Sequence, residues 1–90
     1  MAKINFTRAL KRFYPDLGPM DIQCDRVSDL IEILEEKYPG LKNYLVDDHG
    51  HLRKHVNIFV QERLIKDRAT LLDPIDVDDE VYIMQALSGG

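Results

Sequence analysis

The 90-residue sequence contains one cysteine, no tryptophan and no long apolar run. Cys24 cannot form an internal disulfide, and a single cysteine cannot build a Cys-rich zinc site. No apolar stretch approaches the roughly 20 residues that a membrane helix needs, and the first residues lack the apolar core of a signal peptide. We therefore expect a protein of the reducing cytoplasm that associates with no membrane.

The overall composition, with 44% hydrophobic and 31% charged residues, is that of an ordinary globular protein. The length is that of one small domain. We predict a single domain over residues 1–90, in which residues 87–90 form a flexible C-terminal tail.

Positive charge is missing from residues 69–90, which hold five acids and no base, whereas residues 1–68 hold 12 bases and 11 acids. This balance argues against nucleic acid as a partner. It favours a protein partner that is basic where it meets the C-terminal third, with Asp78 and Asp79 as contact residues. The alternative is a solvated acidic turn. Residues 1–15 carry four bases and no acid, but the alternation of Ile4 and Phe6 is typical of a strand rather than a transit peptide.

Apolar periodicity predicts the secondary structure. Alternation over residues 3–7 and 20–24 indicates two strands around a turn at residues 15–19. A helical stripe over residues 27–38 ends at Pro39-Gly40, and either Asp25 or Ser28 is a candidate cap. Alternation returns in a strand at 56–60, a short strand is possible at 64–65, and an apolar run forms a strand at 81–86.

An almost wholly apolar last strand belongs in the middle of a sheet. The predicted class is therefore α+β, with a mixed sheet of four to five strands and one main helix on one face, which is a β-grasp arrangement. If Val56 and Ile58 face the helix, then Phe59, Tyr82 and Met84 form an apolar patch on the other face. Such a patch is typical of a partner-binding surface, although single scattered surface hydrophobes are an equally good interpretation.

Residues that could carry chemistry are few. His49, His51 and His55 could ligate a transition metal only in principle, and we interpret them as solvated loop residues, so no metal site is predicted. Cys24 is expected to be a small buried thiol. The sequence shows no catalytic constellation and no Gly-rich phosphate loop, which indicates a protein that is not an enzyme.

The C-terminal residues are the exception. Leu87 and Ser88 are followed by Gly89-Gly90, two residues without side-chain bulk. Such a tail can thread its carboxylate through a narrow channel into another protein. The alternative is an ordinary frayed end.

Three segments, residues 56–60, residues 78–83 and Gly89-Gly90, together resemble the ubiquitin-like sulfur-carrier family. This family includes the small subunit of molybdopterin synthase (MoaD type) and the thiamine sulfur carrier (ThiS type). Residues 38–41 and 52–55 look like the MoaD-type branch. The chain departs from the family at Gln61-Glu62, where members often carry Asn-Gly.

The resemblance implies a mechanism in which this chain is a substrate and carrier. An adenylyltransferase similar to ubiquitin-activating enzymes would use ATP to activate the Gly90 carboxylate, and a sulfur donor would convert it to a thiocarboxylate. An acceptor enzyme, such as a molybdopterin synthase large subunit, would receive the sulfur, and the chain itself would bind no cofactor. A protein modifier joined through Gly90 and a β-grasp adaptor are the alternatives, and the product that receives the sulfur (molybdenum cofactor, cysteine, thiamine or another) stays open.

Overall fold

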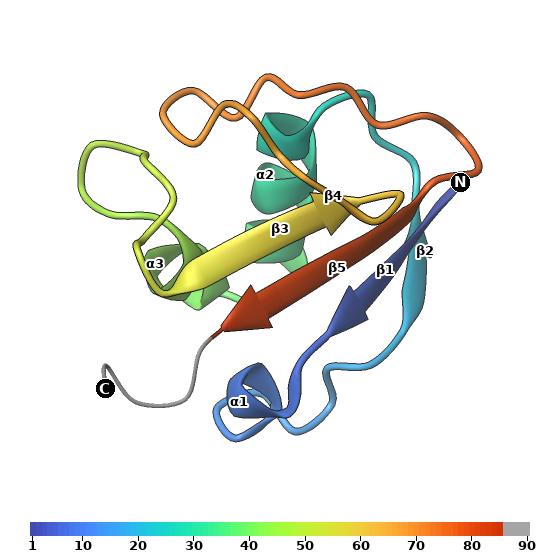
Figure 1. Cartoon of the computed structure of the whole chain (residues 1–90). Coiled ribbons are helices and arrows are strands. Elements are labelled where there is room, and N and C mark those ends of the chain that lie inside the picture. Colours follow the sequence, from blue (N-terminus) through green and yellow to red (C-terminus); the bar gives the residue numbers. More distant parts are fainter. Residues whose placement is uncertain (86–90) are drawn as a thin grey trace.

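Five strands form one mixed sheet in the computed structural model, which describes residues 1–85 (Figure 1). The strand order is β2-β1-β5-β3-β4, so the last strand is central, parallel to β1 and antiparallel to β3. The predicted α+β, β-grasp arrangement is confirmed. The strands are β1 Ala2–Phe6, β2 Met20–Ile22, β3 Val56–Val60, β4 Arg63–Leu64 and β5 Glu80–Gln85.

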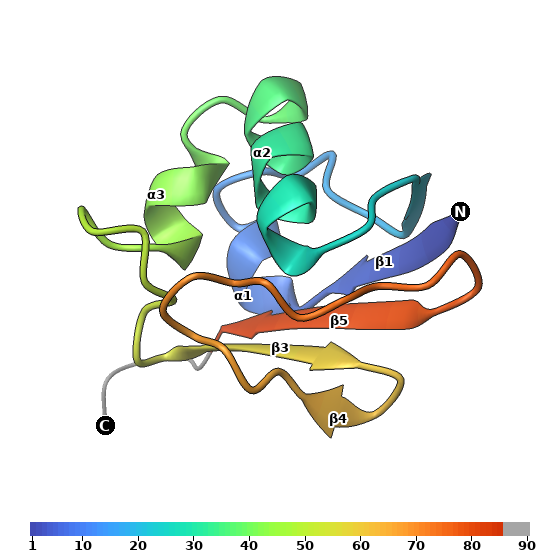
Figure 2. The same ribbon diagram turned by 90° about the horizontal axis from the view of Figure 1, so that it is seen from above.

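The helices of the described chain, α1 (Arg8–Lys11), α2 (Val27–Lys37) and α3 (Leu41–Leu45), all lie on one face of the sheet (Figure 2). None of them is long and apolar enough to cross a membrane. The predicted stripe of α2 is buried and packs on the inward side chains of the sheet, where it removes apolar surface from water. The core includes Val27, Leu30, Ile31 and Leu34 of α2 and Ile4, Val56, Ile58, Val81 and Ile83 of the sheet.

The start of α2 is satisfied by backbone, not by a side-chain cap. Arg26 occupies the capping position and makes no side-chain cap bond, so the expectation of Asp25 or Ser28 is wrong. The Val27 and Ser28 amides donate to the carbonyl oxygens of Asp73 (3.1 Å) and Leu71 (2.8 Å). The loop before β5 thus supplies acceptors to the first turn of the helix.

Two short helices, α1 and α3, were not predicted. Each contributes only two buried apolar residues, too few to show a helical period. Between α2 and α3 the chain reverses at Gly40, whose φ is +96°, and a Cβ there would lie 2.9 Å from the Tyr14 hydroxyl oxygen. The Glu35 carboxylate accepts from the amides of Gly40 (3.0 Å) and Lys42 (2.9 Å), and these bonds lower its pKa. Glu35 therefore organises the start of α3 and is not merely solvated.

Strand β2 ends at Ile22, two residues earlier than predicted, so Cys24 lies outside it. The thiol is half-buried rather than buried, and desolvation, followed by the charges of Asp29 and Asp25, raises its pKa. A thiol with a raised pKa is less nucleophilic at neutral pH.

The loop between β4 and β5 is tied down at several points. Ile65, Leu71 and Ile75 are buried in the core. Asp67 accepts from the Thr70 hydroxyl and from the backbone amide of Thr70 (2.8 Å), among others, and these bonds lower its pKa to about 2. Arg68 donates to the carbonyl oxygens of Arg53 (2.6 Å) and Val56 (2.9 Å) and to the Asn57 side chain (3.3 Å). This guanidinium therefore holds the turn that leads into β3.

Candidate functional site

The end of β5 is held from both sides up to its last residue. On one side, the Thr7 amide donates to the Ile83 carbonyl oxygen (3.2 Å), and the Gln85 amide donates to the Thr7 hydroxyl oxygen (3.2 Å). On the other side, Gln85 is paired with Val56 of β3. The predicted site residues Leu87, Ser88, Gly89 and Gly90, with Ala86, lie outside the described residues. Whatever follows Gln85 therefore begins from the most firmly paired strand of the sheet.

Two basic segments flank this point. Helix α1 begins directly after Thr7, and it lies beside the C-terminal end of β5 in Figure 1. On the β3 side, the Val56 amide donates to the Arg53 carbonyl oxygen (3.0 Å) and closes a turn that contains Lys54. Arg8, Lys11, Arg12 and Lys54 are all exposed. The run of bases without an acid over residues 1–15 is the sequence signal for Arg8, Lys11 and Arg12, but nothing in the sequence connects Lys54 with them.

The acidic residues lie at the opposite end of β5. Asp78 and Asp79 directly precede its first residue, Glu80. Gln85 is five positions further along the strand, a distance of about 17 Å at 3.3 Å per residue. The Asp79 carboxylate accepts from the Asp76 amide (2.8 Å), and the Asp79 backbone carbonyl oxygen accepts from the Lys3 amide (2.9 Å). The two acids predicted as contact residues for a basic partner therefore lie at the end of β5 that is far from Gln85, and their role in binding stays a prediction.

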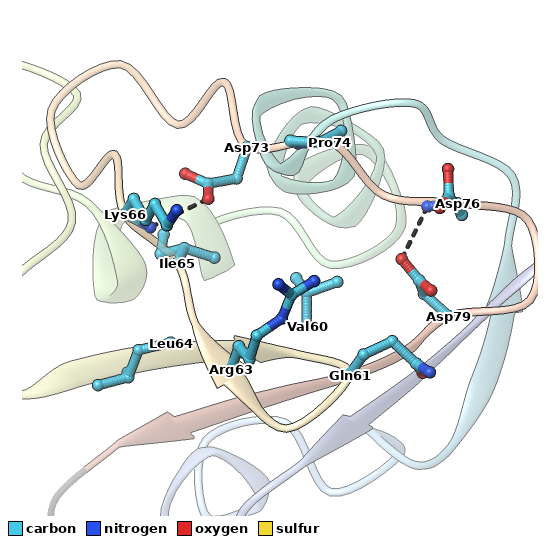
Figure 3. Close-up of a pocket in the computed structure, with 10 residues that line it drawn as sticks. All are labelled: Val60, Gln61, Arg63, Leu64, Ile65, Lys66, Asp73, Pro74, Asp76 and Asp79. Carbon is cyan, nitrogen blue, oxygen red and sulfur yellow. Dashed lines mark hydrogen bonds between the residues drawn. The ribbon is translucent and has the colours of Figure 1, made fainter.

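A hollow of about 290 Å³ lies next to this acidic end, between β4 and the loop that precedes β5 (Figure 3). Figure 3 shows the Asp73 carboxylate facing Lys66 and the Asp79 carboxylate facing Asp76. Asp73 accepts from the amides of Lys66 (3.0 Å) and Asp67 (2.7 Å). Because both carboxylates already accept backbone hydrogen bonds, they stabilise the loop and do not converge on a ligand.

The outward face of the sheet carries the predicted apolar side chains. Tyr82 and Met84 are each 40% exposed, and Phe59 is half-buried opposite Tyr82. Leu64 of β4 pairs with Phe59 of β3 and is 52% exposed. It extends this group of apolar side chains, although the sequence analysis did not include it. We call Phe59, Leu64, Tyr82 and Met84 the outer patch. The strand faces are as predicted, and the role of the patch in binding stays a prediction.

The Tyr82 hydroxyl at the edge of the outer patch donates to the Glu80 carboxylate (3.0 Å). This bond, together with the charge of Glu80, raises the pKa of Tyr82. The side chain offers a partner an apolar ring face with one polar end.

The three histidines do not come together. The amides of His49 (2.9 Å) and His51 (3.0 Å) donate to the Asp47 side chain, which forms the turn and has a lowered pKa as a result. His55 lies further on, in the turn before β3. Within residues 1–85, no group of three or more His, Cys, Asp or Glu side chains is placed to hold a metal ion.

Comparisons with a family model, with curated proteins and with solved structures show which proteins this chain resembles. The ThiS family model matches residues 19–90. Among curated proteins, none matches the sequence. A chain of the BexX/CysO complex from Amycolatopsis orientalis has a TM-score of 0.84 at 19% identity, with 100% of both chains covered. CysO from Mycobacterium tuberculosis has a TM-score of 0.82 at 24% identity, over 97% of this chain and 100% of that chain.

A third similar structure is a chain of the complex of subunits 1 and 2 of molybdopterin-converting factor from Helicobacter pylori 26695. Its TM-score is 0.62 at 17% identity, over 99% of this chain and 97% of that chain. At these identities the three structures establish the fold alone, which is the β-grasp, ubiquitin-like fold. The family match covers most of the chain, and the chain therefore belongs to the ThiS family. These small proteins are sulfur carriers and not enzymes, as the sequence led us to expect.

Proposed function

We propose that the chain carries sulfur as a thiocarboxylate on Gly90. The Gly90 carboxylate would attack the α-phosphorus of ATP on an activating enzyme, releasing pyrophosphate and forming an acyl adenylate. A donor at the oxidation level of sulfide would then attack the acyl carbon, and the C–O bond to AMP would break. The sulfur would finally be transferred in the active site of an acceptor enzyme.

The observation that carries this proposal is the family match, which extends through Gly89 and Gly90. The fold supports it because the proposed tail, residues 87–90, follows the end of the central strand at Gln85. A partner that draws in the tail would pull along a strand held by hydrogen bonds on both sides. The carboxyl group could thus be delivered while the domain stays folded.

The partners would supply the catalytic groups that this chain lacks. We propose that the outer patch makes the apolar part of the contact with them, since exposed aromatic side chains are typical interface anchors. An activating enzyme that uses ATP, a sulfur donor and an acceptor enzyme complete the scheme. Two of the similar structures are complexes, BexX/CysO and the two subunits of molybdopterin-converting factor. An acceptor of the molybdopterin synthase type accordingly stays among the candidates.

Mass spectrometry of the intact protein tests the proposal. The chain is incubated with its activating enzyme, ATP and a sulfide source, and we expect the mass gain for replacement of one oxygen by sulfur. Gly90 deletion should abolish this gain without affecting thermal unfolding, and Gly89→Val should reduce it, because a β-branched residue restricts the backbone and adds bulk. Stable adducts on lysines of other proteins, without any thiocarboxylate, would favour a modifier. A chain that shows neither product would be an adaptor.

A further inference from the structure

Four exposed bases lie in the two segments that flank the end of β5. We propose that these residues, Arg8, Lys11, Arg12 and Lys54, form a docking surface for an acidic face of the activating enzyme. We call them the basic end. The inference rests on the proposed function, because it specifies the chemistry of the partner that receives the tail.

The register of the sheet places these residues around the proposed tail. Thr7 binds the Gln85 amide, and Arg8 is the next residue after Thr7. Val56 pairs with Gln85, and Lys54 lies two residues before Val56. Lys11 is the last residue of the short helix that begins at Arg8, and Arg12 is the C-cap of this helix. A partner that encloses the tail beyond Gln85 must therefore approach the basic end.

The positive charge of the basic end is available for binding. All four side chains are exposed, and the ion pair found within residues 1–85 joins Lys42 to Glu32, elsewhere in the fold. The net charge of the whole chain is −4, so the cluster does not simply reflect composition. With the acids at the other end of β5, the molecule has two charged ends. An acidic partner would attract the basic end and repel the acidic end, so that the tail would approach first.

The surroundings favour a protein over a nucleic acid. Phe13 follows Arg12, is 55% exposed and stacks on Tyr44 with ring centroids 4.8 Å apart. Aromatic residues together with Arg are typical of protein interfaces. A nucleic acid would need a wider positive face than this acidic chain offers. The partner surface expected at the basic end is thus acidic, whereas the acid count over residues 69–90 favours a basic partner surface at the other end of β5.

Association kinetics test the inference. The full chain is mixed with the adenylyltransferase that activates it, and the association rate constant is measured by stopped flow from about 0.01 M to about 1 M NaCl, where the Debye length falls from about 30 Å to about 3 Å. Lys11→Glu/Arg12→Glu should slow association roughly tenfold or more at low salt and remove most of the salt dependence. Lys11→Gln/Arg12→Gln should lie between this variant and the wild type.

A matched control makes the same change in net charge at another place. Arg63→Glu/Lys66→Glu alters exposed residues on and after the edge strand β4, near the acidic end. We expect this pair to change the association rate much less than the Lys11/Arg12 pair. Thermal unfolding of each variant verifies the fold.

The outcomes separate the two proposals. If the wild-type chain forms no thiocarboxylate with any activating enzyme, the proposed function fails and the inference fails with it. Suppose instead that the wild-type chain is thiocarboxylated. If the Lys11/Arg12 and Arg63/Lys66 double substitutions then leave the association rate unchanged, or slow it equally, the inference alone is overturned. It is also overturned if the Lys11/Arg12 variants lose binding to a single-stranded oligonucleotide at physiological salt and keep normal association with the enzyme.

Discussion

Arg68 is the residue whose removal should reveal most about how the fold supports the tail. Its half-buried guanidinium donates to two backbone carbonyls, Arg53 at 2.6 Å and Val56 at 2.9 Å, and to the Asn57 side chain. A hydrogen bond from a charged donor contributes about 1.5 to 3 kcal/mol, and partial exposure favours the lower value. With two short bonds, Arg68→Ala should lower the free energy of unfolding by roughly 2 to 4 kcal/mol. A domain of this length has only about 5 to 13 kcal/mol in total.

Urea unfolding followed by circular dichroism at neutral pH measures this change. Arg68→Lys should recover only part of the loss, because Nη2 donates to both carbonyls while Nη1 donates to the Asn57 side chain, and a single ammonium group cannot reproduce this planar arrangement. Lys66→Ala is the control, since this exposed neighbour should stay within about 0.5 kcal/mol of the wild type. An Arg68→Ala protein as stable as the control would refute the role given to the guanidinium, and full recovery by lysine would refute the argument from geometry.

Three further predictions concern the hairpin, the acid response and the outer patch. Glu62, at φ +68°, occupies a turn position that favours glycine, so Glu62→Gly should raise the free energy of unfolding by roughly 0.5 to 1 kcal/mol. Gln61→Gly, at φ +51°, should gain less in the same urea assay, because the Gln61 side chain also accepts from the Glu80 amide (2.6 Å); an equal gain would contradict this account. The pKa of Asp67 is about 2 in the folded state against 3.8 ordinarily, so its stabilisation is complete above the ordinary value and is lost as the pH falls through about 2. Asp67→Asn should therefore flatten the dependence of the urea midpoint on pH between about 4 and about 2, and an unchanged slope would exclude this carboxylate as a cause. Phe59→Ala should weaken partner binding, measured by calorimetry, by more than about 1 kcal/mol and by more than it destabilises the isolated domain. Leu72→Ala, which alters an exposed residue outside the sheet, should leave binding unchanged. If Phe59→Ala mainly unfolds the domain, the outer patch is not a binding surface.

The elements that the sequence predicted are those with a sustained apolar period. The stripe from Val27 to Leu34 and the alternation around Ile58 and Ile83 reflect burial of one face, which the sequence records directly. The short helices α1 and α3 have too few buried residues to show such a period. The start of α3 is set instead by Glu35, whose carboxylate binds the amides of Gly40 and Lys42. A glutamate in the last turns of a helix gives no sign of such a bond in the sequence.

Charge placement shows a different limit of sequence analysis. The faces of β3 and β5 could be predicted because neighbouring residues alternate between the two sides of a strand. The neighbours of the tail could not be predicted from the acid count of the C-terminal third. Residues close in sequence along β5 lie at opposite ends of the sheet, whereas Thr7 is more than 70 positions from Gln85 and is bonded to it.

The arrangement separates the parts that hold the fold together from those proposed to meet a partner. The buried side chains of β5, Val81 and Ile83, face the helices, and Tyr82 and Met84 alternate with them on the outer patch. The same strand therefore contributes to the core, to the proposed apolar contact and to the start of the proposed tail. Because its hydrogen bonds to β1 and β3 continue up to Gln85, the position of the basic end relative to the outer patch is fixed by the sheet. A partner that contacts both surfaces would meet the tail in one orientation, and such fixed placement is what delivery of a small reactive group into an enclosed site requires.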